Sequence, residues 1–275
     1  MKSYFDIATA SAVNSSDSHW LILQHGAGLM GYILYSTDSK SIIRSRLWLT
    51  GNDAAASEEI IDLIKSETLA VSDIAKVIMV NYHTGYFALP DLFFQEDKIN
   101  HWIDFMIGND PGEKILINEA VDNAIVHVHP IDKGIHTQLV QQFPGVVVRA
   151  LQEFAFFGKR QEGDLLYLTF LNQYIFVTLY SNNQLLLNQG YSFKSPEDVL
   201  YLLLNITDQF LQDKTSLSII PEGFIDADSS LYKLLDAYFP KIEIPETPDF
   251  DYPENALTVS PFILRHIDRI ITCVS

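Results

Sequence analysis

Cysteine is almost absent from this chain: its 275 residues contain only one, Cys273. A single cysteine excludes an internal disulfide framework and every CxxC metal or redox motif. The first residues also lack a charged region followed by an apolar run, so we expect no secretory signal peptide. Together these features favour a reducing, cytoplasmic environment.

Long apolar runs are missing as well. The most apolar stretch, Leu165 to Tyr180, is interrupted by Thr169, Asn172 and Gln173. A membrane-spanning helix needs about 20 predominantly apolar residues, and this shorter stretch has the pattern of a β-hairpin. We therefore expect no integral membrane segment.

Basic residues are scarce. The chain has 18 Lys and Arg against 35 Asp and Glu, which gives a formal charge of −17. Such a surface repels phosphate backbones, so we expect no nucleic-acid partner. Solubility is the simplest role for this charge, and a cationic partner is the alternative. Hydrophobic residues make up 48% of the sequence, enough for a sizeable core.

An internal repeat is the most informative feature that is present. Leu21–Tyr35 and Leu165–Tyr180 each read as strand, turn and strand, end in Leu-Tyr-Ser, and lead through a polar turn into a third strand. Further on, Ile131-Asp132 leads through an amphipathic stretch to Phe143-Pro144. Ile225-Asp226 leads in the same way to Phe239-Pro240. The repeat predicts two similar α/β lobes, which we place at residues 1–149 and 150–275.

The periodicity of apolar residues predicts the order β-β-β-α-β in both halves. Predicted strands of the first half lie near 19–25, 31–35, 42–49, 76–81, 115–118, 124–129 and 146–149, with helices near 57–68, 97–107 and before Phe143. A linking helix is predicted over 151–158. The second half has predicted strands near 165–171, 174–180, 184–191 and 217–220, a helix opened by Ser195-Pro196, an acidic proline-rich connector over 245–254, and a last helix or strand near 261–272.

This order is similar to that of ribonuclease-H-like domains, and two such halves resemble the actin-like ATPase architecture. More narrowly, Phe87-Ala-Leu-Pro90 and the Phe143-Pro144 element resemble an uncharacterised bacterial family that is assigned this fold. The expected fold class is therefore α/β, with two β-β-β-α-β-α lobes.

The resemblance implies a nucleotide site with a defined chemistry. An Asp at the end of the first strand of each half would hold Mg²⁺, and glycines in the hairpin turns would approach the phosphates of ATP. Here the first strand ends Gln24-His25 before Gly26-Ala27-Gly28, so the glycines are present and the carboxylate is absent. The matching turn of the second half, Phe170–Gln173, has neither Asp nor Gly. Where the resemblance implies a glycine pair for adenosine, Ile220–Gly223 offers one glycine.

These departures predict a protein without catalytic residues, metal ligands or cofactor that binds or assembles with other proteins. The alternative is a Mg-ATP-binding enzyme or nucleotide switch with an atypical magnesium site. In that case Gly26, Ala27 and Gly28 would contact the nucleotide, and folding would bring Asp38, Asp53 or Asp91 to the metal.

Two short motifs have simpler structural interpretations. Gly26, Gly28 and Gly31 match the G-x-G-x-x-G spacing, but strand-like residues follow them, which indicates a hairpin turn rather than a dinucleotide site. His127 and His129 alternate on a strand and could share a metal with His136 or Glu119. We prefer an exposed histidine pair on an edge strand.

The densest group of aromatic side chains follows the predicted strand 76–81. It comprises Tyr82, Tyr86, Phe87, Phe93 and Phe94. Core packing accounts for most aromatic residues, yet Tyr and Phe are also enriched in protein interfaces. We therefore predict that this group forms the partner-binding site.

Acidic side chains gather in the same region. Asp91, Glu96 and Asp97 could carry out acid–base chemistry if burial separated their pKa values. Their position in a loop and the first turn of a helix indicates solvated carboxylates instead.

Overall fold

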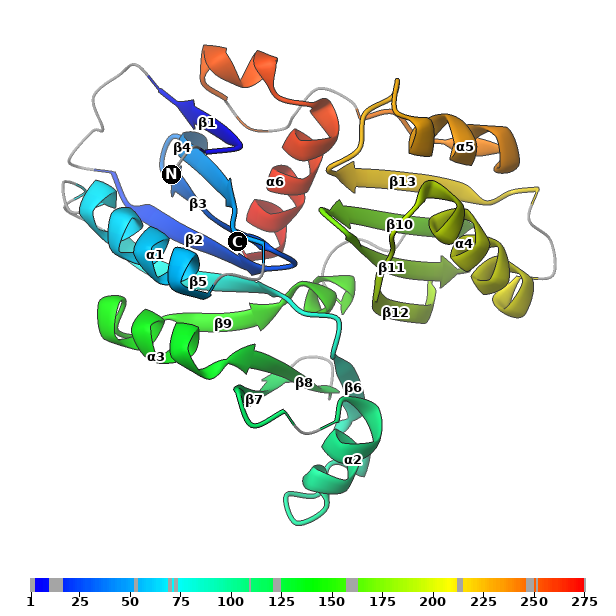
Figure 1. Ribbon diagram of the computed structural model, residues 1–275, viewed down its shortest axis with the longest axis horizontal. Helices are drawn as coiled ribbons and strands as arrows, with labels where there is room; N and C mark the ends of the chain where they lie inside the picture. Colours follow the sequence, from blue (N-terminus) through cyan, green and yellow to red (C-terminus); the bar gives the residue numbers. More distant parts are fainter. Residues whose placement is uncertain are drawn as a thin grey trace. The chain divides into compact units, whose positions relative to one another are not determined.

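The chain forms two compact units in a computed structural model (Figure 1). The structure describes residues 3–9, 17–51, 54–68, 71, 74–108, 110–120, 125–156, 163–211, 215–245, 250 and 252–274. Unit 1 comprises Met1–Phe156 and Phe250–Glu254, and unit 2 comprises Phe157–Asp249 and Asn255–Ser275. The placement of the two lobes at residues 1–149 and 150–275 stays a prediction.

Unit 1 is built on a six-stranded mixed sheet. Its elements in chain order are β1 (Phe5–Ala8), β2 (His19–Gly26), β3 (Leu29–Ser36), β4 (Ser41–Leu49), α1 (Ala54–Thr68), β5 (Ile74–Tyr82), β6 (Phe87–Pro90), η1 (Asp91–Phe93), α2 (Ile99–Met106), β7 (Glu113–Ala120), β8 (Ile125–Asp132), α3 (Lys133–Gln142), β9 (Val147–Ala150) and η2 (Leu151–Phe156). The strand order is β1-β4-β3-β2-β5-β9; β2 to β4 pair antiparallel, and β5 is parallel to β2 and β9.

One face of this sheet is covered by α1 and α3. Side chains of a strand alternate between faces, so Leu21 and Leu23 of β2 point the same way and meet Ile61 of α1 and Leu139 of α3. All four side chains are fully buried. Because each fully buried aliphatic side chain contributes about 1.5–3 kcal/mol, this layer fixes the orientation of β2 and therefore of its carboxyl end.

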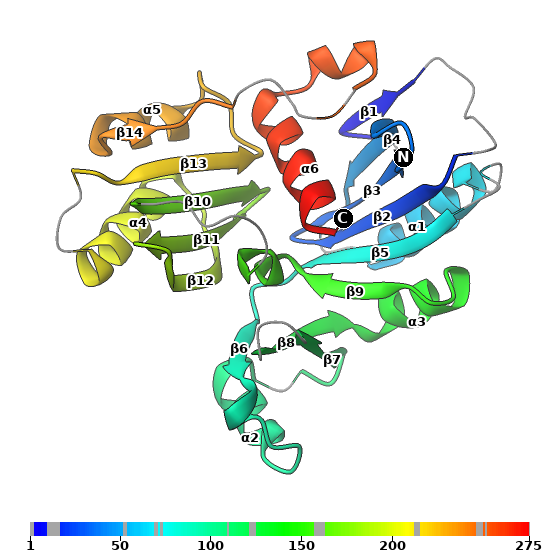
Figure 2. The ribbon, with the colours of Figure 1, turned by 180° about the vertical axis from the view of Figure 1, so that it is seen from behind.

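Unit 1 also contains a smaller sheet, with the order β6-β8-β7. Phe87 of β6 and Val128 of β8 form its core with Ile99 and Ile103, which lie one turn apart on α2. Figures 1 and 2 show α2 extending beyond these three strands.

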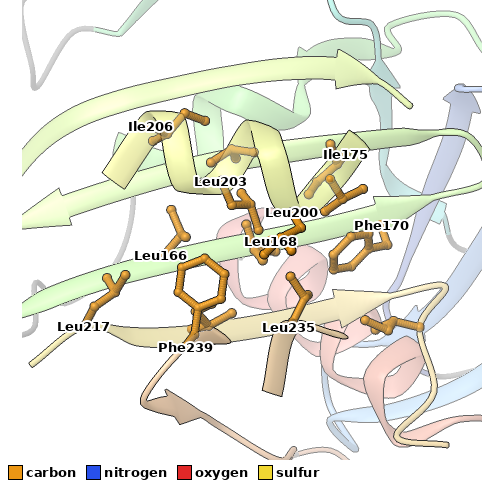
Figure 3. Packing of buried hydrophobic residues seen from close by; sticks show 14 of the residues in the cluster. Leu166, Leu168, Phe170, Ile175, Leu200, Leu203, Ile206, Leu217, Leu235 and Phe239 are labelled. Atoms are coloured by element: carbon orange, nitrogen blue, oxygen red, sulfur yellow. The ribbon is translucent and has the colours of Figure 1, made fainter. Parts of the chain in front are cut away.

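Unit 2 contains a five-stranded sheet. Its elements are β10 (Asp164–Leu171), β11 (Tyr174–Ser181), β12 (Gln184–Ser192), α4 (Pro196–Phe210), β13 (Ser218–Gly223), α5 (Ser230–Tyr238), β14 (Lys241–Ile242), η3 (Glu254–Thr258) and α6 (Pro261–Val274). The order is β12-β11-β10-β13-β14. Figure 3 shows Leu166, Leu168 and Phe170 of β10 beside Leu203 of α4 and Leu235 of α5 in one buried cluster.

The remaining helix, α6, reaches the opposite face of that sheet. Thr169 of β10 lies between Leu168 and Phe170, so it points away from α4, and its register partner on β13 is Glu222. Side chains of α6 bond to both of these residues. α6 thus brings polar groups to the carboxyl ends of two parallel strands.

The predicted repeat and the α/β class with two sheet-rich units are confirmed. The two Phe-Pro elements are equivalent: the backbone N–H groups of Phe143 and Phe239 bond to the carbonyls of Leu139 and Leu235 at the ends of α3 and α5. Both phenyl rings are buried.

Some local predictions differ from the structure. Residues 151–156 of the predicted linking helix form the 3₁₀ helix η2, and residues 157 and 158 lie outside the described residues. The predicted helix over 97–107 is shorter, and β1 was not predicted because its four residues carry too little pattern. Within the described ranges, no helix has both the length and the apolar character needed to cross a bilayer.

Candidate functional site

The three residues predicted to contact a nucleotide form the end of β2 and the turn to β3. Ala27 and Gly28 are the two central residues of the hairpin, with φ of 53° and 75°, which is typical of a type I′ turn. The Gly28 carbonyl accepts hydrogen bonds from Thr50 N (2.8 Å) and Gly51 N (3.0 Å). The hairpin is therefore anchored to the end of β4.

The side chain expected to be a metal-binding Asp is a neutral amide. Gln24 is buried near the end of β2, and its Oε1 accepts a hydrogen bond from the Tyr82 hydroxyl at 2.7 Å. Among the described residues, Gln24 Nε2 and His25 Nδ1 have no hydrogen-bond partner although both are buried. Burial lowers the pKa of His25 to about 4, against the opposing charge of Asp132. This strand end is polar, buried and uncharged near neutral pH.

The equivalent turn of unit 2 joins β10 to β11 through Asn172 and Gln173. Asn172 has a φ of 53°, a left-handed conformation that Asn tolerates better than most residues. The Gln173 carbonyl accepts a hydrogen bond from Phe193 N at 2.9 Å. The turn is thus built by different residues from those of the β2–β3 turn and carries no glycine.

A charged cluster that the sequence did not predict lies at the ends of β10 and β13 in unit 2. Oε1 of Glu222 accepts hydrogen bonds from Thr169 Oγ1 (2.6 Å) and Arg269 Nη1 (2.9 Å), and lies 2.9 Å from His266 Nδ1. The guanidinium carbon of Arg269 lies 5.7 Å from the centroid of the Tyr167 ring. We call Thr169, Glu222, His266 and Arg269 the Glu222 cluster.

Burial and charge act in opposite directions on Glu222. Burial disfavours the carboxylate, but the charge of Arg269 and the hydrogen bonds from His266 and Thr169 outweigh it and hold the pKa at about 2. Burial also raises the pKa of the neighbouring Cys273 thiol, which makes it a poor nucleophile at neutral pH. The Glu222 carboxylate and the Arg269 guanidinium are therefore both charged, and paired, near neutral pH.

One sequence signal could have revealed the Glu222 cluster. Glu222 interrupts a continuous apolar strand, which is expensive unless the charge is paired. His266 and Arg269 lie three residues apart, on one face of the amphipathic helix α6.

The histidine pair of β8 is not exposed. His127 and His129 are both fully buried, and β8 is the central strand of its sheet, so the prediction of an exposed pair on an edge strand was wrong. β8 pairs with β7 along one edge and with β6 along the other.

Each histidine has its own hydrogen-bond partner. His127 Nδ1 lies 2.8 Å from the Tyr86 hydroxyl, and His129 Nδ1 lies 3.1 Å from Asn81 Nδ2. His129 Nε2 lies 3.6 Å from Oε1 of the buried Glu153. Burial lowers the pKa of both histidines to about 4, so they are neutral structural groups near pH 7.

The candidates for a third ligand lie elsewhere. His136 Nε2 lies 3.3 Å from the Lys114 ammonium, and Glu119 is exposed on β7. Across the described ranges, no group of three His, Cys, Asp or Glu side chains has an arrangement that could hold a metal ion.

The aromatic group predicted to bind a partner divides into buried and exposed members. Tyr82, Tyr86 and Phe87 are 2%, 4% and 5% exposed, whereas Phe93 is 58% exposed. Phe94 is half-buried against the core of the three-stranded sheet. Only Phe93 offers most of its ring to a partner, and the partner-binding role of this group stays a prediction.

The three carboxylates of the alternative magnesium site are not gathered at the glycine turn. Asp38 lies in the β3–β4 turn, at the opposite end of β3 from Gly28, and its Oδ2 accepts a hydrogen bond from Ser18 N at 2.6 Å. Eight residues of extended strand separate the two ends, which corresponds to roughly 25 Å. Asp91 is exposed in η1, and Asp53 lies outside the described residues.

Comparison with solved structures identifies the fold class as that of the actin-like ATPases. A Bacteroides thetaiotaomicron protein with an actin-like ATPase fold and unknown function superposes with a TM-score of 0.69 at 16% identity, over 84% of this chain and 93% of that one. The PilM-PilN type IV pilus biogenesis complex contains a chain with a TM-score of 0.55 at 10% identity, over 93% of this chain and 98% of that one.

The chain belongs to the DUF3822 family, described as a protein of unknown function, whose sequence profile matches residues 9–242. Comparison with curated proteins finds no match. The family and fold resemblance that the sequence predicted is therefore confirmed. The activity has to be inferred from the chemistry of the residues described above.

Proposed function

We propose that this protein is an actin-like fold that has lost nucleotide hydrolysis and acts in the cytoplasm as a binding or assembly protein. The observation that carries the proposal is the Glu222 cluster. The carboxylate at the end of β13 is already neutralised by Arg269 and accepts three contacts on one oxygen. Mg²⁺ binds carboxylate oxygens at about 2.1 Å and would have to displace that cation from a buried position.

The end of β2 supports the same conclusion. The carbonyl oxygen of Gln24 accepts a hydrogen bond from the Tyr82 hydroxyl. A neutral amide supplies no negative charge to balance a magnesium triphosphate. The ends of β2 and β10, the two first strands where the resemblance implies an Asp, carry no carboxylate.

The fold itself is compatible with assembly. A similar fold occurs in a chain of the PilM-PilN type IV pilus biogenesis complex, which functions as a complex of proteins. That likeness supports a role for this fold in protein assembly.

Mg-ATP binding at the β2–β3 turn is the second candidate function. It is favoured by the buried Gln24 Nε2 and His25 Nδ1, which have no hydrogen-bond partner among the described residues. These atoms leave hydrogen-bonding capacity beside Gly26, Ala27 and Gly28 that a ligand could use.

Thermal unfolding with and without millimolar Mg-ATP, Mg-ADP or Mg²⁺ alone separates the two candidates. We expect no nucleotide-dependent change in Tm. Ligand at about 100 times its dissociation constant would stabilise the native state by about 2.7 kcal/mol and raise Tm by several degrees. A rise of that size would overturn the first proposal.

Matched variants would then locate the nucleotide. Ala27→Asp adds a carboxylate to the β2–β3 turn, and Asn182→Asp adds one to the β11–β12 turn at a similar φ of 47°. Loss of the Tm shift in Ala27→Asp alone would place the phosphates at the β2–β3 turn, because like charges repel.

A further inference from the structure

The helix α2 and the preceding η1 present an apolar surface to solvent. Trp102, Phe105 and Met106 of α2 are 39%, 82% and 50% exposed, and Leu92 and Phe93 of η1 are 85% and 58% exposed. We call these five residues the α2 patch, because they lie in one short segment of the chain. Five large apolar side chains exposed within fifteen residues are characteristic of an interaction surface.

The fold of unit 1 does not require these side chains. Ile99 and Ile103 already attach α2 to the core of the three-stranded sheet. Ile99, Ile103 and Met106 share one stripe of α2, and Trp102 and Phe105 widen it, because each residue turns the helix by about 100°. The apolar face of α2 is therefore broader than the stripe that Ile99 and Ile103 bury, and its exposed part can be covered by a second element.

Carboxylates lie in the same segment of the chain as the α2 patch. Asp91, Glu96, Asp97 and Asp104 are exposed in the same segment, against one ammonium group, that of Lys98. Within the described ranges, none of the four carboxylates forms an ion pair. The partner that complements this surface therefore combines an apolar stripe with positive charge.

Charge also disfavours two other occupants. A symmetric contact with a second copy would place the same carboxylates of both chains against one another. An anionic lipid surface would meet the same repulsion.

We propose that the α2 patch binds an amphipathic helix of another protein whose apolar stripe is flanked by Lys and Arg. This inference rests on the proposed binding or assembly function and names the chemistry of the partner. Because α2 has eight residues, it is about 12 Å long and covers about two turns of a partner helix. A contact that short depends on charge, so added salt weakens it.

A fluorescence titration of the full chain tests the proposal, because Trp102 lies in the α2 patch. The probe is an 18-residue peptide of Leu and Lys, with Leu at positions i, i+3, i+4 and i+7. We expect a blue shift and saturable binding as Trp102 is covered. A Leu/Glu peptide with the same apolar stripe should bind at least tenfold more weakly.

Variants assign the binding to the patch. Phe105→Gln should weaken binding at least tenfold, and Asp97→Asn combined with Asp104→Asn at least threefold. Tyr238→Gln, at a 58% exposed position on α5, should leave binding unchanged. Trp102→Phe should remove the blue shift while an anisotropy titration with labelled peptide still reports binding. Thermal unfolding confirms that each variant is folded.

Four outcomes would overturn the proposal: equal affinity for the Leu/Glu peptide, no effect of Phe105→Gln and the Asp variants, an equal Trp102 shift with phosphatidylcholine vesicles, or a concentration-dependent dimer that Phe105→Gln abolishes. Each of them leaves the nucleotide result unchanged. Failure of this inference is therefore distinguishable from failure of the proposed function, which the Mg-ATP scan decides.

Discussion

Gly26 lies so close to Tyr82 that a β-carbon at position 26 would sit 2.3 Å from the Tyr82 carbonyl oxygen. Gly223 has the same relationship to Phe170 in unit 2, also at 2.3 Å. Both contacts join the ends of two parallel strands, β2 with β5 and β10 with β13. Close backbone approach is therefore a sufficient reason for both glycines.

Gly26→Ala should destabilise the protein more than Gly51→Ala. Both glycines have positive φ, +111° and +59°, but nothing lies within 4 Å of a β-carbon at position 51. We expect a loss of about 1 kcal/mol for Gly51→Ala from backbone strain and at least about 3 kcal/mol for Gly26→Ala, where the clash adds to it. Urea unfolding measures the free energy of unfolding of both variants. Equal losses would mean that β2 and β5 accommodate the added β-carbon without an energetic penalty.

Glu222 and Arg269 should be strongly coupled energetically. Arg269→Met leaves a buried carboxylate without its cation, and we expect a loss of about 3–5 kcal/mol. Adding Glu222→Gln should recover at least about 1 kcal/mol relative to additivity in a double-mutant cycle.

The exposed pair of Lys241 and Glu243, 3.6 Å apart, is the matched control for this cycle. Lys241→Met and Glu243→Gln should show a coupling below about 0.5 kcal/mol. Additive losses at Glu222 and Arg269 would mean that the ion pair does not survive in solution.

Stability should fall as pH is lowered from about 6.5 to 4. Burial lowers the pKa of His25, His127 and His129 to about 4, so in this window the unfolded chain binds protons that the folded chain does not. The free energy of unfolding therefore decreases with falling pH, by on the order of 3 kcal/mol for each fully buried group.

Urea unfolding at intervals of half a pH unit measures this slope, and His129→Gln should reduce it. The exposed His101→Gln serves as the control for the substitution. A slope that His129→Gln leaves unchanged would place the proton uptake at other groups.

The first turn of α4 should depend on Ser195. Its hydroxyl accepts the Asp198 backbone N–H at 3.2 Å, and the Asp198 carboxylate accepts the Ser195 N–H at 3.0 Å. Ser195→Ala should cost about 1 kcal/mol, while Asn205→Ala at an exposed position of the same helix should be neutral or stabilising. Thermal unfolding compares them, and equal effects would argue against a capping role.

The repeat was predictable because its signals are local. The hairpin Leu21–Tyr35 combines apolar strands with a glycine turn, and Ser195-Pro196 begins a helix in both the prediction and the structure. The order of elements along each half followed from the same short-range pattern. The fold class and the family then came from the resemblance of that order, and of Phe87-Ala-Leu-Pro90 and the Phe143-Pro144 element, to known proteins.

The Glu222 cluster was not predictable in the same way. Glu222 and Arg269 are 47 residues apart in the sequence, and Thr169 and Arg269 are 100 apart. Only the pairing of β10 with β13 and the placement of α6 bring them together. The burial of His127 and His129 likewise depends on β6, which pairs with β8 from about 40 residues earlier in the chain.

The aromatic group shows the same limit. Its density was visible in the sequence, but its burial was not: the hydroxyl of buried Tyr82 bonds to Gln24, which lies 58 residues away, and that of buried Tyr86 lies against His127. The exposure of Phe105 and Trp102 depends on which face of α2 meets the three-stranded sheet. Periodicity alone does not show which part of the broad apolar face of that helix is buried.

The chain passes from one unit to the other after residues 156, 249 and 254. Phe250 returns to unit 1, where its ring centroid lies 5.6 Å from that of Tyr35, and α6 then supplies the cation of Glu222 in unit 2. Unit 1 therefore lacks one of its contacts until residue 250 has been synthesised, and Glu222 lacks its counter-ion until residue 269 has been. On the ribosome, unit 1 cannot reach its final set of contacts before residue 250 has emerged, and unit 2 cannot do so before residue 269 has emerged.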